Sequence, residues 1–321
     1  MTFLFLSAKI KGIVNPEKER VVPMNNERSR VVKGSIAAAM GGVCWGFSGT
    51  CGQYLFSEFG ISSLWLTCLR LLSAGILMVG MALISHRSDL VKIWKDPKDA
   101  ACLLAYGVFG LMMCQYSYMT SISHSNAATT TVLQTLSLVI IMLITCVQTR
   151  RRPTRVEAIS LVLALFGTFM LATGGDPRHM VLSPASLFWG LATACAVAAY
   201  TLIPRRLLQR WSREAVSGLG MLFGGLVLNL GARSWNFQVS LPMAGWLAVG
   251  CIVIIGTVVS FSLFMLGIRD AGPVRASMLG VTEPLSAAVF SAVWLGTSFS
   301  VADLIGFAAI TATMFLLAKS E

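Results

Sequence analysis

One acidic side chain lies in the middle of a long apolar stretch near the end of the chain. Residues 272–296 contain a single carboxylate, Glu283, eleven residues after Gly272. About 20 apolar residues span the ~30 Å hydrocarbon core of a bilayer, so Glu283 is predicted near its midplane. Carboxylates at this depth are rare and usually face a bundle interior or a water-filled path, which suggests contact with a solute or a proton. The alternative is a protonated Glu283 that only fixes helix packing.

Pro284 follows this carboxylate directly. Proline removes a backbone donor and crowds the carbonyl four residues earlier, which here belongs to Gly280. We therefore expect the helix to bend or open beside Glu283.

A polar stripe is predicted on the apolar segment 126–149. Its members recur at helical spacing on one face: Asn126, Thr130, Gln134 and Ser137. They are candidates for the wall of a solute pathway opposite Glu283. The alternative is that they only form hydrogen bonds between helices, worth ~0.6 kcal/mol each on average.

Aromatic and amide side chains complete the candidate pathway: Trp45, Gln115, Tyr116 and Tyr200. Aromatic rings with hydroxyl groups suit an amphipathic organic solute. Trp45 is too far from its helix ends for an interfacial belt, so it either lines a cavity or packs in the core.

Arg70 is a second charge inside an apolar segment, eight residues into 62–84. At the helical rise this is roughly 12 Å from the segment end. The favoured interpretation is a structural arginine that bonds loop or helix-end carbonyls, and pairing with a carboxylate is the alternative.

The composition requires membrane helices to hold these residues. The 321 residues are 55% hydrophobic and 12% charged, unlike a soluble domain. Ten apolar segments are predicted as helices: 34–56, 62–84, 100–120, 126–149, 155–174, 183–203, 215–232, 243–267, 272–296 and 300–319.

The basic residues predict the orientation of these segments. With the N-terminus inside, 22 of the 25 Lys and Arg residues fall on inner segments, while Arg178 and Arg233 fall outside and Arg70 within a helix. This asymmetry predicts both termini on the cytoplasmic side. The basic loops are then topology determinants and lipid-headgroup contacts, and no nucleic acid partner is expected.

No motif in the chain indicates catalysis, a metal or a cofactor. The eight cysteines lie in predicted helices without a CxxC pair, and the three histidines are scattered. A GxxxxGK[ST] motif is absent from the sequence, so ATP hydrolysis is not expected. An intramembrane enzyme would need clustered acids, bases or nucleophiles at membrane depth, and Glu283 is the single deep acid.

The chain also repeats itself. A shift of 146 residues places 121–133 on 267–279 and, in the same register, FMLA at 169–172 on FLLA at 315–318. The predicted organisation is a tail at 1–33, expected to be disordered, a first repeat at 34–174 (five helices) and a second at 183–319 (five helices). Because five is odd, the second repeat must enter the membrane inverted. Met24 is an alternative start of the chain.

Four motifs resemble those of the EamA-type carriers in the drug/metabolite transporter superfamily. They are WGFSG (45–49), WLTCLRLLSAGIL (65–77), SNAATTTVLQTLS (125–137) and GPVRASMLGVTEPLSA (272–287). The resemblance implies ten helices in two repeats and export of small metabolites, often amino acids or related compounds, through a central cavity. Leu138 stands where such carriers usually have a proline equivalent to Pro284, so 126–149 is expected to be the straighter helix.

The sequence therefore predicts an all-α integral membrane protein of the bacterial inner membrane. Its predicted function is secondary transport that exports small amphipathic metabolites, drugs included, by alternating access, with proton coupling through Glu283. A channel-like uniporter for similar solutes is the alternative. The expected partners are a small-molecule solute and membrane lipids, and association into a homodimer is left open.

Overall fold

The structure is a computed structural model that describes residues 24–320, and every predicted apolar segment lies on a helix within this range. In the first half the long helices are α2 (Met24–Phe59), α3 (Ser63–Ser85), α5 (Pro97–Ala105), α6 (Met113–His124), α7 (Ala127–Thr135), α8 (Ser137–Gln148) and α9 (Arg155–Thr173). In the second half they are α10 (Pro184–Leu202), α12 (Arg213–Ala232), α13 (Met243–Val253), α14 (Ser260–Ala271), α15 (Pro273–Leu279), α16 (Thr282–Leu295) and α17 (Val301–Ser320). The short connecting helices are α4 (Arg87–Lys92), η2 (Ile93–Lys95), α11 (Arg205–Arg210) and η4 (Ser234–Asn236).

The helices have the length and composition of membrane spans. Within the described residues, eight are long and apolar enough to cross a bilayer on these two criteria. Two further helical segments are shorter than these eight spans: α16, which has 14 residues, and the apolar part of α17, Val301–Leu317. The predicted all-α membrane class is thereby confirmed.

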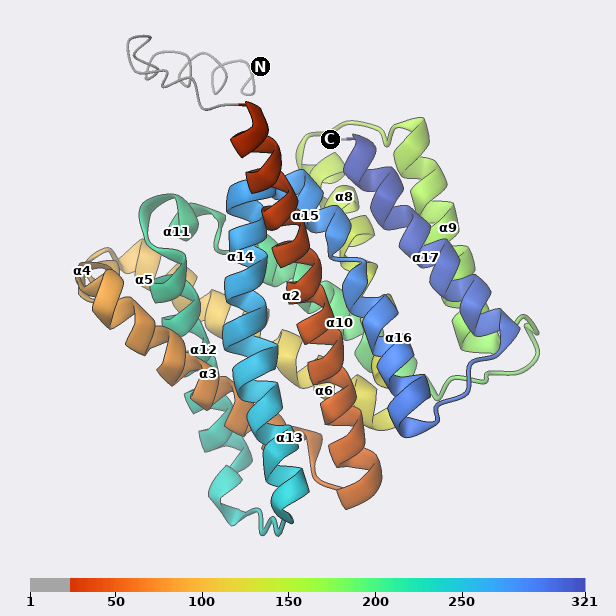
Figure 1. The fold of residues 1–321 in the computed structure, drawn as a ribbon, viewed down its shortest axis with the longest axis horizontal. Coiled ribbons are helices and arrows are strands. Elements are labelled where there is room, and N and C mark those ends of the chain that lie inside the picture. Colours follow the sequence, from red (N-terminus) through yellow and green to blue (C-terminus); the bar gives the residue numbers. More distant parts are fainter. Residues whose placement is uncertain (1–23, 321) are drawn as a thin grey trace.

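Helix α2 packs between α14 and α16 (Figure 1). The other large contacts join α3 to α12, α9 to α17, and α10 to α6, α7 and α8. The first helix of the first half, α2, packs against α14 and α16 of the second half. The first helix of the second half, α10, packs in the corresponding way against α6 and α7–α8 of the first half. The pairs α3–α12 and α9–α17 each join corresponding helices of the two halves. The packing is thus consistent with two equivalent halves.

Two wide helical turns add to this equivalence. A π-helix, η3 (Tyr106–Met112), joins α5 to α6, and a second, η5 (Ile254–Val259), joins α13 to α14. A shift of 146 residues carries the first onto 252–258, which overlaps the second. Such π-turns are rare and often lie at functional sites.

Helix breaks also lie at matching places in the two halves. The helix that contains Pro284 is interrupted at 280–281, where the Glu283 amide donates to the Gly280 carbonyl at 3.0 Å. This is the bend expected from proline. The segment 126–149, which was expected to be the straighter helix, is interrupted as well, at Leu136.

The helical start of α2 corrects one further expectation. Residues 24–33, predicted as part of a disordered tail, belong to α2. The helix extends past the apolar segment, and Arg30 near its start is paired with Asp270 at the end of α14 at 3.1 Å. The rest of the predicted tail, including Met1, lies outside the described residues.

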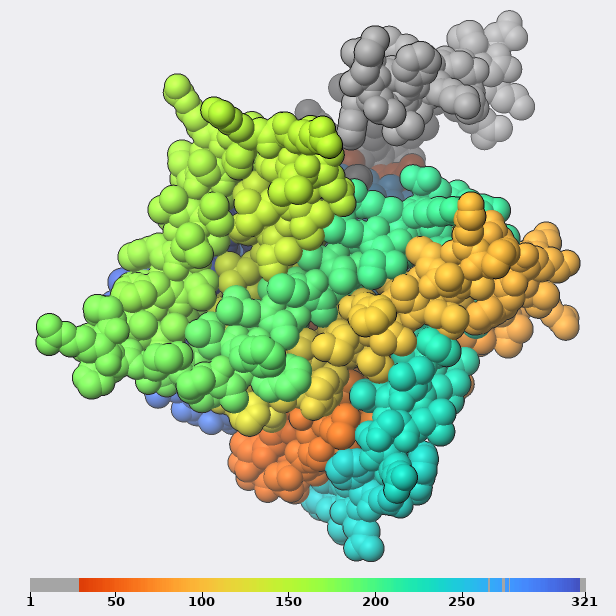
Figure 2. Space-filling model, turned by 180° about the vertical axis from the view of Figure 1, so that it is seen from behind, coloured from red at the N-terminus to blue at the C-terminus, as the bar shows by residue number. Residues whose placement is uncertain are grey.

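The connections gather at two ends of the molecule. The first turns of α2 and the last turns of α17 lie at the same end (Figure 1). On the opposite face, the green segment of α10 and α11 runs between the yellow-green residues of the α8–α9 region and the orange residues of α4 and α5 (Figure 2). We call the end that holds α4, α11 and the α8–α9 loop the basic end.

A charged clamp joins two loops at the basic end. Arg210 pairs with Asp96 at 2.8 Å and with Asp99 at 2.7 Å, and Arg206 pairs with Asp99 at 3.1 Å. The indole of Trp211 donates to buried Asp99 at 2.9 Å. The clamp therefore connects the loop before α5 to the loop after α10.

The clamp predicts a pH dependence that begins only in acid. The hydrogen bond from Arg210 lowers the pKa of Asp96, so its contribution is fully present above the ordinary aspartate pKa of about 3.9 and is lost as pH falls through the lower folded value. Asp96→Asn keeps the helix cap that Asp96 provides to Lys98 N–H but removes the charge. We expect a melting temperature about 1–3 °C lower at pH 7 and a difference that vanishes well below pH 4.

Thermal unfolding in detergent across this pH range measures the effect. Asp176→Asn is the matched control, because Asp176 bonds only within its own loop, to Arg178 N at 2.9 Å. A difference for Asp96→Asn that stays constant down to pH 3 would contradict the assignment.

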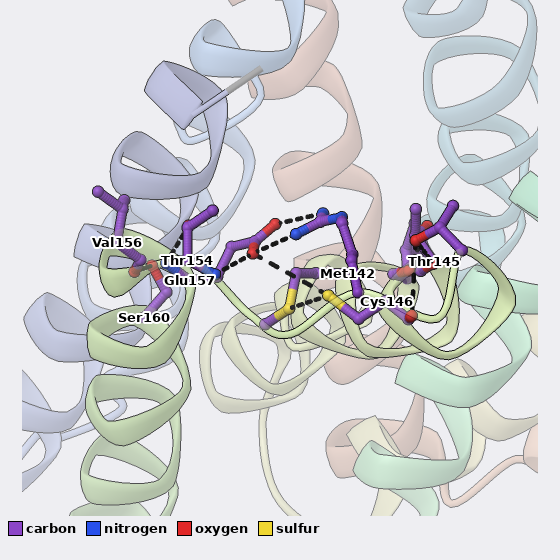
Figure 3. A network of polar contacts seen from close by, with 10 residues as sticks. Met142, Thr145, Cys146, Thr154, Val156, Glu157 and Ser160 are labelled. Atoms are coloured by element: carbon purple, nitrogen blue, oxygen red, sulfur yellow. Dashed lines mark hydrogen bonds and ion pairs between the residues drawn. The ribbon is translucent and has the colours of Figure 1, made fainter. Parts of the chain in front are cut away.

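The α8–α9 loop is fixed by a second carboxylate (Figure 3). Glu157 and Thr154 form a capping box at the start of α9, and Arg151 makes two bonds of 2.7 Å to the two Glu157 oxygens. The Cys146 thiol of α8 also faces Glu157. Arg151, one of the basic loop residues for which lipid-headgroup contact was predicted, thus orders the α8–α9 loop.

Candidate functional site

A cavity of about 460 Å³ lies between the two halves. This is within the size range of pockets that enclose small organic ligands. Its wall receives side chains from α2, α3, η3, α6, α7, α10, α12, η5, α14 and α16. The halves of the chain therefore contribute jointly to one chamber.

Glu283 and Gln134 meet in this wall at the two helix breaks. Glu283 lies in the first turn of α16, just after the interruption at 280–281, and Gln134 lies near the end of α7, just before Leu136. The Gln134 amide faces the Glu283 carboxyl group closely enough to interact with it. A polar side chain thus lines the cavity beside each of the two helix breaks.

Arg70 lies in the same wall as Glu283 and Gln134. Its side chain is buried, with 6% of the residue surface exposed. Two guanidinium nitrogens, Nε and Nη1, have no hydrogen-bond partner among the described residues. Tyr118, Cys114 and Glu283 are near enough to interact with its charge. The cavity wall thus contains a buried cation and a carboxyl group.

Aromatic side chains form much of the remaining wall. Trp45 lines the cavity and packs against Phe264 with ring centroids 5.0 Å apart. The other aromatic residues in the lining are Tyr106, Tyr118, Tyr200, Phe261 and Phe264. Gln115 contributes an amide. This mixture of rings and a few polar groups is typical of sites for amphipathic organic compounds.

Four predicted pathway residues lie elsewhere. Asn126 caps α7, accepting from Thr129 N–H at 2.8 Å, and Thr130 is bonded to Ser121 of α6 at 3.0 Å. Ser137 is buried outside the described lining, and Tyr116 packs on Trp189 with ring centroids 5.2 Å apart. Gln134 is thus the member of the polar stripe that reaches the cavity.

The sequence analysis identified only Gln115 from one cavity-lining face of the η3–α6 segment. Leu111, Cys114, Gln115 and Tyr118 all line the cavity. Their spacing of three, four and seven residues is the helical-face pattern. This spacing, rather than the neighbouring tyrosines at 116 and 118, is the signal that could have identified the face.

The cavity extends from the two helix breaks toward the basic end. Its lining continues from Glu283 past Tyr200 and Pro204 to Leu208 and Arg213, and the last two are exposed. No residue of the opposite end belongs to the lining within the described part of the chain. The chamber therefore has its approach from one side.

Gln53 closes the opposite end. Its carbonyl oxygen accepts from the Ala127 amide and the Ser291 hydroxyl, and its amide donates to Thr297, all at 2.9 Å. These bonds connect α2 with the start of α7, the last part of α16 and the connection that follows it. Beneath them are fully buried apolar residues: Leu55, Leu66, Met119, Ile122 and Ile252. We call this group of bonds the Gln53 closure.

These features define a polytopic α-helical membrane protein with a charged, aromatic cavity lined by both halves of the chain. The chain belongs to the EamA-like transporter family, whose model matches it twice, over residues 32–173 and 184–319. The second match ends 146 residues after the first, which is the shift found in the sequence.

Relatives of this chain carry transporter names. It is 38% identical over 287 residues to the uncharacterized inner membrane transporter YicL of Salmonella typhimurium, covering 89% of this chain and 95% of that protein. It is 26% identical to the uncharacterized transporter YwfM of Bacillus subtilis, covering 82% and 86%. A solved crystal structure aligns with a TM-score of 0.58 at 18% identity over 90% of this chain and 96% of the other, which shows a shared fold.

Proposed function

We propose that this protein is a secondary transporter that exports small amphipathic metabolites across the bacterial inner membrane by alternating access. The observation that carries the proposal is the cavity: it holds charged and aromatic groups at mid-depth, is approached from the basic end and is closed at the other by Gln53. A carrier caught open to one side has this arrangement, whereas a channel needs a path that is continuous from end to end.

The proposed architecture is ten transmembrane helices in two inverted five-helix repeats. Three observations support it: the twofold family match, the matching positions of η3 and η5, and helix pairs that persist when the halves are exchanged. Five crossings per repeat would reverse the second repeat in the membrane. Two broken helices that meet at mid-depth are typical of carriers with such repeats.

The basic end is proposed to face the cytoplasm, with both termini on that side. Supporting this, 22 of the 25 Lys and Arg residues lie on segments predicted inside. The inner membrane location is inferred from the name of the Salmonella relative. The cavity would then be open to the cytoplasm, where an exported solute is loaded.

Counterflow in proteoliposomes tests carrier against channel. Metabolite profiling of the medium from cells that overproduce the wild type or Glu283→Ala first identifies a compound whose release differs. In a carrier, that compound trapped inside vesicles accelerates entry of the labelled compound from outside. Equal fluxes with and without the trapped compound would favour the channel alternative.

Coupling to protons is proposed to run through Glu283. The carboxyl group lines the cavity and lies near Gln134 of α7, Arg70 of α3, Cys114 and Tyr118 of α6, and Tyr200 of α10. It is the carboxylate of the lining. A group that can gain and lose a proton in this position can make solute movement depend on the pH gradient.

Glu283→Gln is expected to abolish that dependence, because glutamine keeps the size and polarity of the side chain but cannot ionise. Flux of the identified compound should become equal with and without an imposed pH gradient, while counterflow persists. Glu58→Gln, at an exposed position of α2, is the control and should respond like the wild type. Unchanged pH dependence in Glu283→Gln would remove Glu283 from the coupling step.

A further inference from the structure

Arg70 is a charged group that the fold leaves incompletely bonded. Its residue surface is 6% exposed, yet Nε and Nη1 have no acceptor among the described residues. A guanidinium remains protonated in proteins and carries five N–H donors. Buried charges are ordinarily paired and hydrogen-bonded, because an unpaired one is costly. The other buried charges described above, such as Asp99, have direct partners.

The position of Arg70 explains where its missing acceptor would come from. The side chain is part of the cavity wall, so the space that borders it is the space a solute would occupy. Glu283 is in the same wall, but among the described ion pairs none joins it to Arg70. A solute in the cavity is therefore the group that can supply acceptor oxygens to Arg70.

We propose that the transported solute carries a carboxylate and that Arg70 binds it. The inference rests on the proposed function, because it takes the cavity as the solute site. A carboxylate matches a guanidinium in shape and charge, and such pairs are among the strongest hydrogen-bonded contacts in proteins. A second basic residue, Arg213, lies where the lining reaches the basic end, and its charge attracts anions toward the cavity.

The surroundings favour a single negative charge on an apolar body. Glu283 lies near Arg70 and would repel a dianion such as a phosphate ester. The rest of the wall is largely apolar, with Trp45, Met221, Phe261 and Phe264 among its members. An apolar group of the solute would be buried against these side chains while the carboxylate meets Arg70.

Matched acid and amide pairs test this recognition. The probes are 3-phenylpropanoate with 3-phenylpropanamide, 4-methylpentanoate with its amide, L-phenylalanine with L-phenylalaninamide, and L-leucine with L-leucinamide. Binding to the purified full-length protein is measured by isothermal titration. In at least one pair the acid should bind 10-fold or more tightly than the amide. Equal affinities in all four pairs, or no binding by any acid, would overturn the proposal.

Three variants assign the preference to Arg70. Arg70→Met should reduce the acid-to-amide ratio to about one, and Arg70→Lys should retain part of it, because lysine keeps the charge but not the planar donors. Arg152→Gln, which removes a positive charge at an exposed position outside the lining, is the matched control and should keep the ratio. If Arg152→Gln removes the preference as fully as Arg70→Met does, general attraction and not Arg70 selects the acid.

Stability separates solute binding from a structural role. If the partner of Arg70 is the solute, Arg70→Met removes an unpaired buried charge from the ligand-free protein. This variant should then melt at the same or a higher temperature than the wild type. A lower melting temperature, with no change in acid preference, would identify a structural arginine. If the protein prefers the acids but shows no counterflow, the transporter proposal is contradicted, while the proposed carboxylate recognition by Arg70 still holds.

Discussion

Replacing Gly46 with leucine is expected to leave little correctly folded protein. Gly46 of α2 faces the first turns of α16, and a Cβ atom added there would lie 2.6 Å from the Glu283 carbonyl oxygen and 2.8 Å from the Ala287 amide nitrogen. Both are backbone atoms, so no side-chain rotation relieves the overlap. The two helices would have to separate, at a cost of about 3 kcal/mol or more in overpacking.

The yield and melting temperature of the protein in detergent measure this effect. Gly80→Leu is the matched control, since a Cβ at Gly80 of α3 meets no atom within 4 Å. Leucine there should be neutral or slightly stabilising, because it is the better helix former. A Gly46→Leu protein that melts with the wild type would mean that α2 and α16 do not pack as described.

Gln53→Leu is expected to weaken the closure of the end opposite the basic end. Leucine cannot replace the three bonds that Gln53 makes to Ala127, Ser291 and Thr297. Each buried donor left without an acceptor costs about 1–3 kcal/mol. Separation of α2 from α7 and α16 lets water satisfy these groups, so the variant should favour a state open at this end.

Labelling of Cys51 reports that opening. Cys51 lies two residues before Gln53 in α2, and 1% of its surface is exposed. Its reaction with a membrane-impermeant thiol reagent, read by peptide mapping, should be about tenfold faster in Gln53→Leu, which corresponds to a population shift of about 1.4 kcal/mol. Gln148→Leu, at an exposed position at the end of α8, is the control. Equal Cys51 labelling in the two variants would show that Gln53 does not hold this end closed.

Helix positions could be predicted from the sequence because a bilayer imposes length and composition on every crossing. The segment predicted at 155–174 is α9, Arg155–Thr173, and the one predicted at 215–232 is α12, Arg213–Ala232. The larger differences are at helix ends that continue beyond the membrane. The start of α2 at Met24 is one, because Arg30 finds a partner outside the apolar stretch.

Which face of a helix meets the cavity could not be predicted from one helix at a time. Asn126 and Thr130 share a stripe with Gln134, yet their side chains satisfy a helix start and a neighbouring hydroxyl. The position of Arg70 in its segment led us to expect bonds to loop or helix-end carbonyls, and its depth alone did not indicate the cavity that it lines. These outcomes depend on how helices cross, which is decided by contacts between residues far apart in the chain.

The helix break at Leu136 occurs without a proline, next to a group of threonines. The hydroxyls of Thr131 and Thr135 donate to the carbonyls of Ala127 and Val132, and the Leu136 amide bonds the Leu133 carbonyl at 3.1 Å, three residues back. Threonine bonds of this kind compete with the helix and bend it. A cluster of threonines can thus supply in one half the interruption that Pro284 supplies in the other.

The paired π-helices give the molecule a mechanical property. A π-turn contains one residue more than an α-helical turn. The helix that contains it is less tightly hydrogen-bonded at that point and can bend there without losing a turn. η3 and η5 occupy corresponding points of the two halves, next to the chamber wall. In the alternating-access mechanism proposed above, each half would bend at its own π-turn, and the two turns occupy corresponding positions beside the cavity.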